Sequence, residues 1–189
     1  MRNLKKLGTF VVALLALSAI GVASASAATF TASATGKLEG HALNTQVFTT
    51  NGGTVKCTAA KTTGNILFTA TTEQHVTVEY SGCTAFGGFK ATVSPATYIF
   101  TASGVVHIEN IITIDVPGLL CKVTVGGQSV NSVIYDNNSF HTKIIETSTI
   151  SNIAYSSSGG FCGTSGTNGT YTGNNEIERL NGGSVTYDS

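Results

Sequence analysis

The segment Gln74-His-Val-Thr-Val-Glu-Tyr80 decides the fold class, because apolar and polar side chains alternate along it without a break. In an extended chain, Val76, Val78 and Tyr80 point to one side, and the histidine, threonine and glutamate between them point to the other. Alternation with a period of two is typical of a β-strand that has one face in the core and one face in water. The segment Cys121–Val125 repeats the pattern.

Similar short segments recur through the rest of the chain, and turn sequences rich in Gly, Asn and Asp separate them. Within 106–116, alternation would place Asn110 on the apolar face, so we expect a turn or bulge at Glu109-Asn110. The Ser- and Gly-rich stretch Ser156–Gly169 predicts a long surface loop. The other expected strands are 30–35, 43–49, 54–58, 65–71, 89–93, 97–101, 128–135, 140–146, 150–155, 169–172, 176–180 and 184–187.

No segment of residues 28–189 keeps the 3.6-residue apolar period of a helix over three turns. Many short strands with turn signals between them favour a sandwich or a barrel, and polar residues on one strand face favour antiparallel pairing. The sequence therefore predicts an all-β fold, an antiparallel two-sheet sandwich, with a barrel as the alternative. No Pro-rich or charged linker divides residues 28–189, so we expect a single domain.

The N-terminal residues have the layout of a secretory signal peptide. Three basic residues precede the apolar run 7–20, and small residues follow in two A-x-A patterns that end at Ala25 and Ala27. We expect a signal helix within residues 1–27 and cleavage between Ala27 and Ala28, with cleavage after Ala25 as the alternative. The apolar run is shorter than the roughly 20 residues that span a bilayer. The sequence therefore predicts a secreted protein, extracellular or at the cell surface, with no integral membrane segment after cleavage.

Charge argues against two classes of partner. The signal segment holds three of the ten basic residues and none of the ten acidic ones, which leaves residues 28–189 with a net charge of −3. The basic residues are scattered along the chain and form no cluster. Nucleic acids and anionic lipids bind to concentrated positive patches, so we expect neither as a partner.

All four cysteines, Cys57, Cys83, Cys121 and Cys162, lie in the part expected to be exported. An even number in an oxidising compartment predicts two disulfides. The sequence allows three pairings, and we favour Cys57–Cys83 with Cys121–Cys162, because each closes a moderate loop without crossing the other. A zinc site is the alternative, but it usually brings two ligands close together in sequence, and the chain has no CxxC.

Several segments carry a resemblance to a known family. They are Gln46-Val-Phe-Thr49, Gly53-Thr-Val-Lys-Cys57, Tyr80-Ser-Gly-Cys-Thr-Ala-Phe-Gly87, Cys162-Gly163 and Gly169-Thr-Tyr-Thr-Gly173. Together they resemble a family of uncharacterised secreted, β-rich actinobacterial proteins, and the likeness runs over most of residues 28–189. The resemblance implies export and β-structure and supplies no activity.

Histidines are the first candidates for a metal site. His75, His107 and His141 each fall on the polar face of an expected strand, where three imidazoles could meet around zinc or copper. No two histidines have the close spacing that gives a local pair of ligands. We therefore favour three separate histidines facing solvent, and expect no metal ligands and no cofactor.

Acidic pairs are the candidates for hydrolysis, which uses two carboxylates or a nucleophile with a base. The closest pairs are Glu73 with Glu79 and Glu176 with Glu178. The second pair shares a strand face, which places its carboxylates about 7 Å apart. Such a pair more often keeps an edge strand soluble. Since the chain also has no GxSxG motif, we assign no catalytic residue.

Polar turns and strands offer other binding surfaces. The oxygen-rich turn Asp136–Ser139 could bind calcium, although it has one carboxylate where calcium sites use several. A flat aromatic platform for sugars is not expected, because the chain has no Trp, and of its six tyrosines Tyr80 and Tyr98 face the core. Threonine pairs that could form an ordered surface are Thr29/Thr31, Thr147/Thr149 and Thr170/Thr172.

These observations lead to a functional expectation by elimination. We expect a secreted, non-catalytic protein that acts by binding or as a surface or matrix component, through another protein or through self-association. Few Lys and Pro residues guard the expected strand edges, which favours strand addition to a partner. The alternatives are a secreted hydrolase with a carboxylate or histidine site outside known motifs, and a carbohydrate-binding module.

Overall fold

The computed structural model describes residues 27–189, so the predicted signal peptide lies outside the described residues except for Ala27. This range forms strands and one short 3₁₀ helix, Pro117–Leu119. The strands are β1 (Thr29–Ala32), β2 (Gly36–Ala42), β3 (Gln46–Thr50), β4 (Gly53–Ile66), β5 (Ala70–Thr71), β6 (Glu73–Ala85), β7 (Phe89–Lys90), β8 (Thr92–Val93), β9 (Ala96–Thr101), β10 (Val106–Ile108), β11 (Ile112–Val116), β12 (Cys121–Val125), β13 (Gln128–Val130), β14 (Val133–Asn137), β15 (Ile144–Ser158), β16 (Gly166–Arg179) and β17 (Val185–Asp188). Among these residues, no helix has the length and apolar character needed to cross a bilayer.

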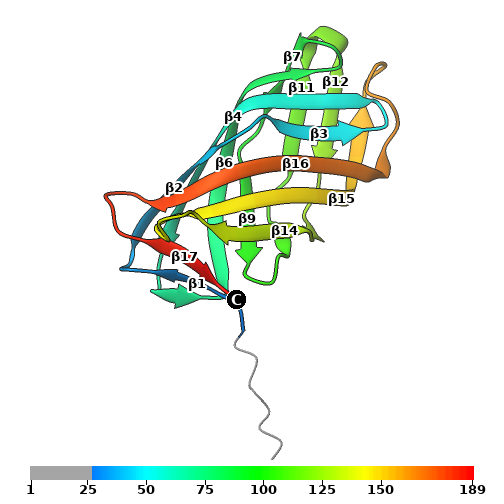
Figure 1. Cartoon of the computed structure of the whole chain (residues 1–189). Helices are drawn as coiled ribbons and strands as arrows, with labels where there is room; N and C mark the ends of the chain where they lie inside the picture. Colours follow the sequence, from blue (N-terminus) through cyan, green and yellow to red (C-terminus); the bar gives the residue numbers. More distant parts are fainter. Residues whose placement is uncertain (1–26) are drawn as a thin grey trace, which may run out of the picture.

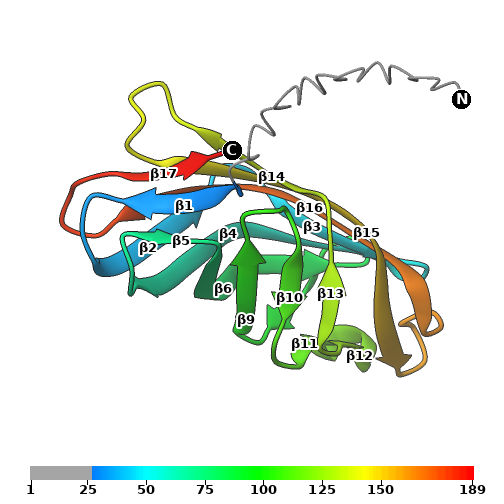
Figure 2. The ribbon, with the colours of Figure 1, turned by 90° about the horizontal axis from the view of Figure 1, so that it is seen from below.

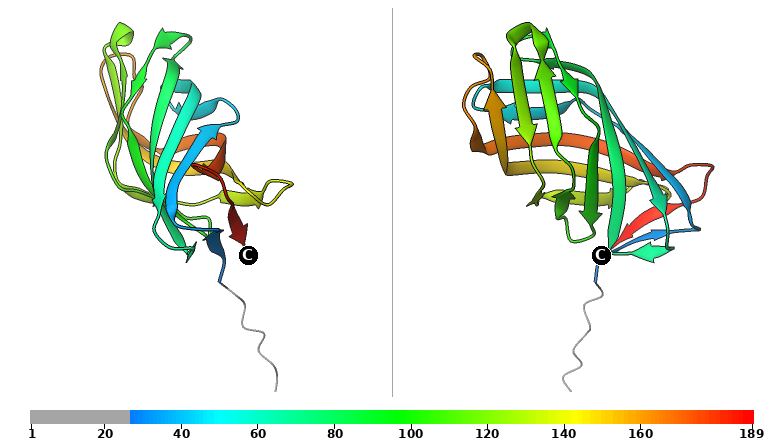
Figure 3. Two further views of the ribbon diagram at one scale, coloured as in Figure 1. Left: turned by 90° about the vertical axis from the view of Figure 1, so that its left-hand side faces the viewer. Right: turned by 180° about the vertical axis from the view of Figure 1, so that it is seen from behind.

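The strands form two layers that run across each other (Figure 1). One layer contains β2, β3, β4, β14, β15 and β16, and the other contains β6 and β9 to β13 (Figure 3). Neighbouring strands pair antiparallel throughout, with β6 next to β4 and β9 next to β6. The expected all-β, antiparallel two-sheet sandwich is thus confirmed.

The two layers belong to one hydrogen-bonded sheet that bends between them. The first half of β15 pairs with β14 and β16, whereas its end pairs with β12 in the other layer. Register shifts between Ile150 and Ile153, and again before Tyr155, mark the bend, and Asn152 there has φ +60°. Bulges of this kind let a strand turn a corner and pass from one layer to the next.

A small second sheet covers one end of the sandwich. Its order is β17-β1-β5, and it lies beside the open ends of β2 and β6 (Figure 2). Phe30 of β1 contacts the ring of Tyr135 edge-on, with centroids 5.0 Å apart, and Val185 of β17 is buried. The small sheet therefore closes the core from below.

Two expected boundaries are wrong because bent strands are longer than the local pattern suggests. β15 runs unbroken from Ile144 to Ser158, where two strands, 140–146 and 150–155, were expected. β16 likewise joins two expected strands and begins at Gly166, so the long loop expected over Ser156–Gly169 is reduced to 159–165. Alternation is interrupted at bulges, which makes one strand resemble two.

Three smaller differences come from turn residues inside expected strands. Ser132 adopts φ +79° and divides 128–135 into β13 and β14. The segment 140–146 begins in a hairpin where His141 has φ +52°, and 65–71 contains an exposed turn at Leu67 and Phe68. The break expected at Glu109-Asn110 is confirmed, because β10 ends at Ile108 and β11 begins at Ile112.

The core lies between the layers and follows the alternation of the sequence. Val76 and Val78 of β6 are 5% and 6% exposed, and Tyr80 packs against the same core. The intervening His75, Thr77 and Glu79 lie on the outer face of the strand, with Thr77 half-buried and the other two exposed. The stretch that predicted the fold class therefore has the orientation that its pattern implied.

Candidate functional site

A partly open cavity of about 140 Å³ lies between the two layers. Most of its wall is aliphatic or aromatic, as is usual for sites that hold small molecules. The wall also contains a group of polar side chains that point inward from several strands. They are Gln46, Thr62, Gln74, Tyr80, Tyr98, Tyr135, Glu146, Ser148, Tyr171 and Asn175.

Glu146 is the one acidic side chain among the described residues of this wall. It lies on the inner face of β15, directly opposite Tyr135 of β14 on one side and Asn175 of β16 on the other. The side chain is buried, with 4% of its surface exposed. Three polar groups from three neighbouring strands thus form a single row across the sheet.

Hydrogen bonds hold the Glu146 carboxylate in place. One oxygen accepts a hydrogen bond from Ser148 Oγ, and the other accepts one from Asn175 Nδ2. Burial raises the pKa of the Glu146 carboxyl, and these two hydrogen bonds oppose part of the rise. The effect of burial is larger than that of the two hydrogen bonds, so the protonated carboxyl is more favoured in the folded protein than in water.

Tyrosine hydroxyls form a second polar group in the cavity. The hydroxyls of Tyr80 and Tyr98 share a hydrogen bond of 2.9 Å, and Tyr171 donates to Gln46 Oε1. Burial raises the pKa of Tyr80, Tyr98 and Tyr171 well above the ordinary value. Gly173 makes room for Gln46, since a Cβ at that position would lie 2.0 Å from Gln46 Oε1.

Two polar atoms in the wall have no partner. Tyr135 Oη and Asn175 Oδ1 are buried and make no hydrogen bond within the described residues. Their residues are 7% and 8% exposed, and both border the cavity beside Glu146. An unpaired buried polar atom costs about 1–3 kcal/mol, so each atom favours a hydrogen-bonding group placed in the cavity.

The buried carboxyl predicts a pH-dependent stability that a Glu146→Gln variant should lack. The folded protein keeps the Glu146 proton to higher pH than the unfolded chain, so stability is full below the unfolded pKa and falls as pH rises through the folded pKa. We expect urea unfolding of the wild type to show this loss as the pH rises above the ordinary pKa of a glutamate. The amide variant keeps an acceptor for Asn175 and should show a smaller loss. Equal slopes for the two proteins would contradict the assignment.

The structure does not bring the three candidate histidines together. His75 lies 3.6 Å from Glu109, whereas His107 Nδ1 bonds Ser129 Oγ at 2.7 Å. His75 and His107 are separated by β9, and His141 lies in the hairpin before β15. No three His, Cys, Asp or Glu side chains between residues 27 and 189 are grouped so that they could hold a metal ion.

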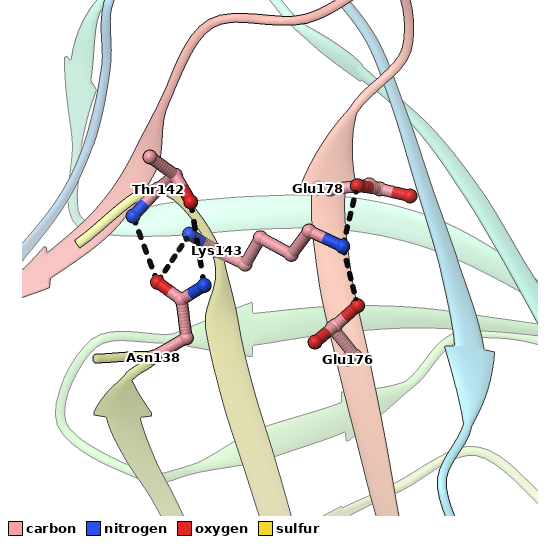
Figure 4. A network of polar contacts seen from close by, with 5 residues as sticks. All are labelled: Asn138, Thr142, Lys143, Glu176 and Glu178. Carbon is pink, nitrogen blue, oxygen red and sulfur yellow. Dashed lines mark hydrogen bonds and ion pairs between the residues drawn. The ribbon is translucent and has the colours of Figure 1, made fainter. Parts of the chain in front are cut away.

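The candidate acidic pairs also differ from a catalytic pair. Glu176 and Glu178 share the outer face of β16, but Lys143 Nζ lies between them, at 2.6 and 2.9 Å (Figure 4). Glu79 lies six positions after Glu73 along β6, which places the two residues about 20 Å apart. Glu176 and Glu178 therefore belong to a cross-strand ion-pair network with Lys143, which the hairpin at Asn138 holds in position.

The oxygen-rich turn uses its amides within the fold. Asn138 Oδ1 accepts hydrogen bonds from the backbone of Thr142 and Lys143, and Asn137 pairs both of its amide atoms with the backbone of Tyr187. These contacts close the hairpin and join it to β17. The side-chain amide oxygens of Asn137 and Asn138 are therefore engaged in the fold.

The threonine pairs are brought together in part. Thr149 lies opposite Thr172 across β15 and β16, and Thr170 lies opposite Thr49 of β3. The pair at Thr29 and Thr31 lies apart from them in the small sheet. All six tyrosines lie within the described residues and none is classed as exposed, so they form no outward platform for a sugar ring.

The two disulfides, Cys57–Cys83 and Cys121–Cys162, are the pairs that the sequence favoured. Cys57 and Cys83 are direct cross-strand neighbours on β4 and β6, and all four cysteines are paired. Two disulfides are typical of an oxidising environment. The alternative cleavage site after Ala25 lies outside the described residues, which begin at Ala27.

Sequence reasoning missed Glu146, the residue at the centre of the cavity wall. The segment 140–146 was expected to end at this residue, which made the glutamate a strand terminus. A signal was present, because positions 144, 146, 148 and 150 alternate with outward ones and carry Ile, Glu, Ser and Ile. A charged residue among the inward-facing positions of a strand indicates either a bulge or a buried polar site. Glu146 belongs to a buried polar site.

Comparison with known proteins identified no relative of this chain. No family model, no curated protein and no solved structure matches it.

Proposed function

We propose that this is an exported, non-catalytic binding protein that holds a small, largely apolar molecule in the cavity between its layers. The observation that carries the proposal is the cavity wall, which is apolar apart from a convergent polar group in which Tyr135 Oη and Asn175 Oδ1 have no partner among residues 27–189. Apolar walls with a few converging polar groups are characteristic of ligand sites. The signal-like sequence of residues 1–27 and the two disulfides support export.

The composition of the wall supports binding rather than catalysis. The described residues that line it include one carboxylate, no histidine and no free thiol. Acid–base hydrolysis uses two groups with separate roles, such as paired carboxylates or a nucleophile and its base. Glu146 has amide and hydroxyl neighbours instead, which suit it to hydrogen bonding.

Ligand-induced stabilisation tests the proposal. The mature protein is screened by thermal denaturation against neutral and cationic molecules of benzene size, with native mass spectrometry of the protein as isolated. We expect at least one molecule to stabilise the fold in a saturable manner, by about 2.7 kcal/mol at one hundred times its Kd. A screen without any saturable stabilisation, together with a protein that carries no small molecule, would overturn the proposal.

A matched pair of variants locates the binding. Val78 points into the cavity from β6, and the adjacent Thr77 lies on the outer face. Val78→Phe should fill space in the cavity and abolish the stabilisation, whereas Thr77→Phe should keep it. If Val78→Phe fails to fold, Val130→Phe at another part of the wall serves the same purpose.

A second candidate function is association with another copy of the chain through a strand edge. β14 forms a ladder only with β15 within the described residues, and its outward Ile134 is 61% exposed. Phe140 in the following hairpin is 82% exposed. Exposed edges with apolar side chains favour strand pairing between chains.

Sedimentation velocity over a range of concentrations tests the second candidate. We expect a concentration-dependent dimer that Ile134→Lys abolishes and Ile111→Lys leaves intact, since Ile111 is 64% exposed in a turn away from β14. A monomer at every concentration would remove this candidate and leave the cavity proposal unaffected.

A further inference from the structure

The surroundings of Glu146 define the chemistry that the cavity can accept. Its carboxylate oxygens accept two hydrogen bonds, and the neighbouring Tyr135 Oη and Asn175 Oδ1 are free. A free amide oxygen can only accept, and a phenol oxygen can accept or donate. The row therefore presents mainly acceptors, and a molecule with N–H donors complements it.

Glu146 also has no cationic partner among residues 27–189. Of the described residues that line the cavity, none is Lys, Arg or His. The ion pairs of residues 27–189 involve other carboxylates, those of Asp115, Glu109, Glu176 and Glu178. A buried carboxylate requires a counter-charge or a proton, since an unpaired charge in a low dielectric is costly.

Aromatic rings surround the same end of the cavity. The ring of Tyr135 lies 5.0 Å from that of Phe30, 5.3 Å from that of Tyr187 and 6.5 Å from that of Phe100. Aromatic faces attract cations, most strongly where water is excluded. A carboxylate, two free oxygens and several rings together form a setting for an organic cation.

We infer that the ligand of this cavity is a small primary amine, whose ammonium group lies against Glu146, Tyr135 Oη and Asn175 Oδ1 and whose apolar part fills the remaining space. The inference rests on the proposed binding function and names its ligand class. An ammonium group offers three donors, which matches the carboxylate and the two free oxygens. An ionised Glu146 would repel an anionic ligand, and with a neutral ligand the carboxyl would have to keep its proton.

The size of the cavity limits the amine. An engineered cavity of about 150 Å³ holds one benzene molecule, and this one is about 140 Å³. Benzylamine is therefore a suitable probe, because it combines one ring with one ammonium group. Benzyl alcohol has the same number of non-hydrogen atoms and no charge, which makes it the matched neutral control.

Calorimetric titration of the mature protein at pH 8 with both probes tests the inference. We expect benzylamine to bind about tenfold or more tightly than benzyl alcohol, as a charge-assisted hydrogen bond implies. Glu146→Gln should bring the two affinities to within about twofold. Glu176→Gln removes the same charge from the outer face of the adjacent strand and should leave the preference intact.

The possible results separate the ligand class from the binding function. Benzyl alcohol binding as tightly as benzylamine would overturn the amine class and leave the cavity as a binding site. A preference for benzylamine that survives in Glu146→Gln would overturn the role of the carboxylate. Binding of neither probe, nor of any other molecule of the screen, would overturn both proposals. If Glu146→Gln does not fold, Tyr135→Phe replaces it, and an unchanged benzylamine affinity in that variant would contradict the inferred contact.

Discussion

The folded protein should lose stability steeply once the pH rises above 10. Burial raises the pKa of four tyrosines, Tyr80, Tyr98, Tyr135 and Tyr171, while tyrosines of the unfolded chain ionise near pH 10. The native state then holds protons that the unfolded state releases, so stability falls with rising pH. Each such tyrosine costs about 1.4 kcal/mol per pH unit, and four cost about 5 kcal/mol per unit. Since a domain is stable by only about 5–15 kcal/mol, we expect unfolding within about one to three pH units.

Simultaneous measurement of tyrosinate absorbance and circular dichroism checks this result. The buried tyrosines should ionise only as the β-sheet signal disappears, in one cooperative step. The double variant Tyr80→Phe/Tyr98→Phe removes two of the four hydroxyls together with their shared hydrogen bond. Its stability should fall about half as steeply with pH. Ionisation of all six tyrosines near pH 10 in a protein that stays folded would contradict the argument.

Loss of the disulfides is the second large effect that we expect. Cys57–Cys83 spans 26 residues and Cys121–Cys162 spans 41, so in the chain-entropy model they contribute about 3.5 and 4 kcal/mol. Replacing either pair by alanine should therefore remove a large part of the total stability. Removal of both pairs should leave the chain unfolded at room temperature.

Chemical denaturation of the two double variants measures these contributions. The Cys121–Cys162 variant should be the less stable of the two, because its loop is longer. Reduction of the wild type without substitution is the control, since it breaks the same bonds and keeps the sulfur atoms. A cost below about 1 kcal/mol for both variants would show that the loops are already constrained by the sheet.

Local sequence predicted those parts of the fold that depend on local chemistry. The alternation around Val76 and Val78 identified inward and outward faces, because each side chain in a strand is placed by its own parity. The turn at Glu109-Asn110 was predicted because Asn110 would otherwise fall among the apolar, inward-facing positions. In the structure, the side-chain amide of Asn110 hydrogen-bonds the backbone of Thr97 and Pro95. The pairing of the cysteines followed from loop length.

Features that depend on distant residues were not predictable in the same way. The length of β15 depends on β12, β14 and β16, which pair with different parts of it and support its bend. The role of Glu146 depends on Asn175, a direct neighbour in space that is 29 residues away in sequence. A single sequence shows that such a glutamate breaks the pattern, but only the pairing of the strands shows what it faces.

The pairing of β1 with β17 has a consequence for the order of folding. Phe30 lies opposite Tyr187, and Thr31 Oγ1 bonds both Thr186 and Asp188. These partners are separated by more than 150 positions, so the pairing of β1 with β17 can form only after residues 185–188 have become available. Contacts between such distant segments are slow to form, because a very long loop must close first. Until the C-terminal strand arrives, Phe30 remains uncovered on that side and the end of the core stays open to solvent.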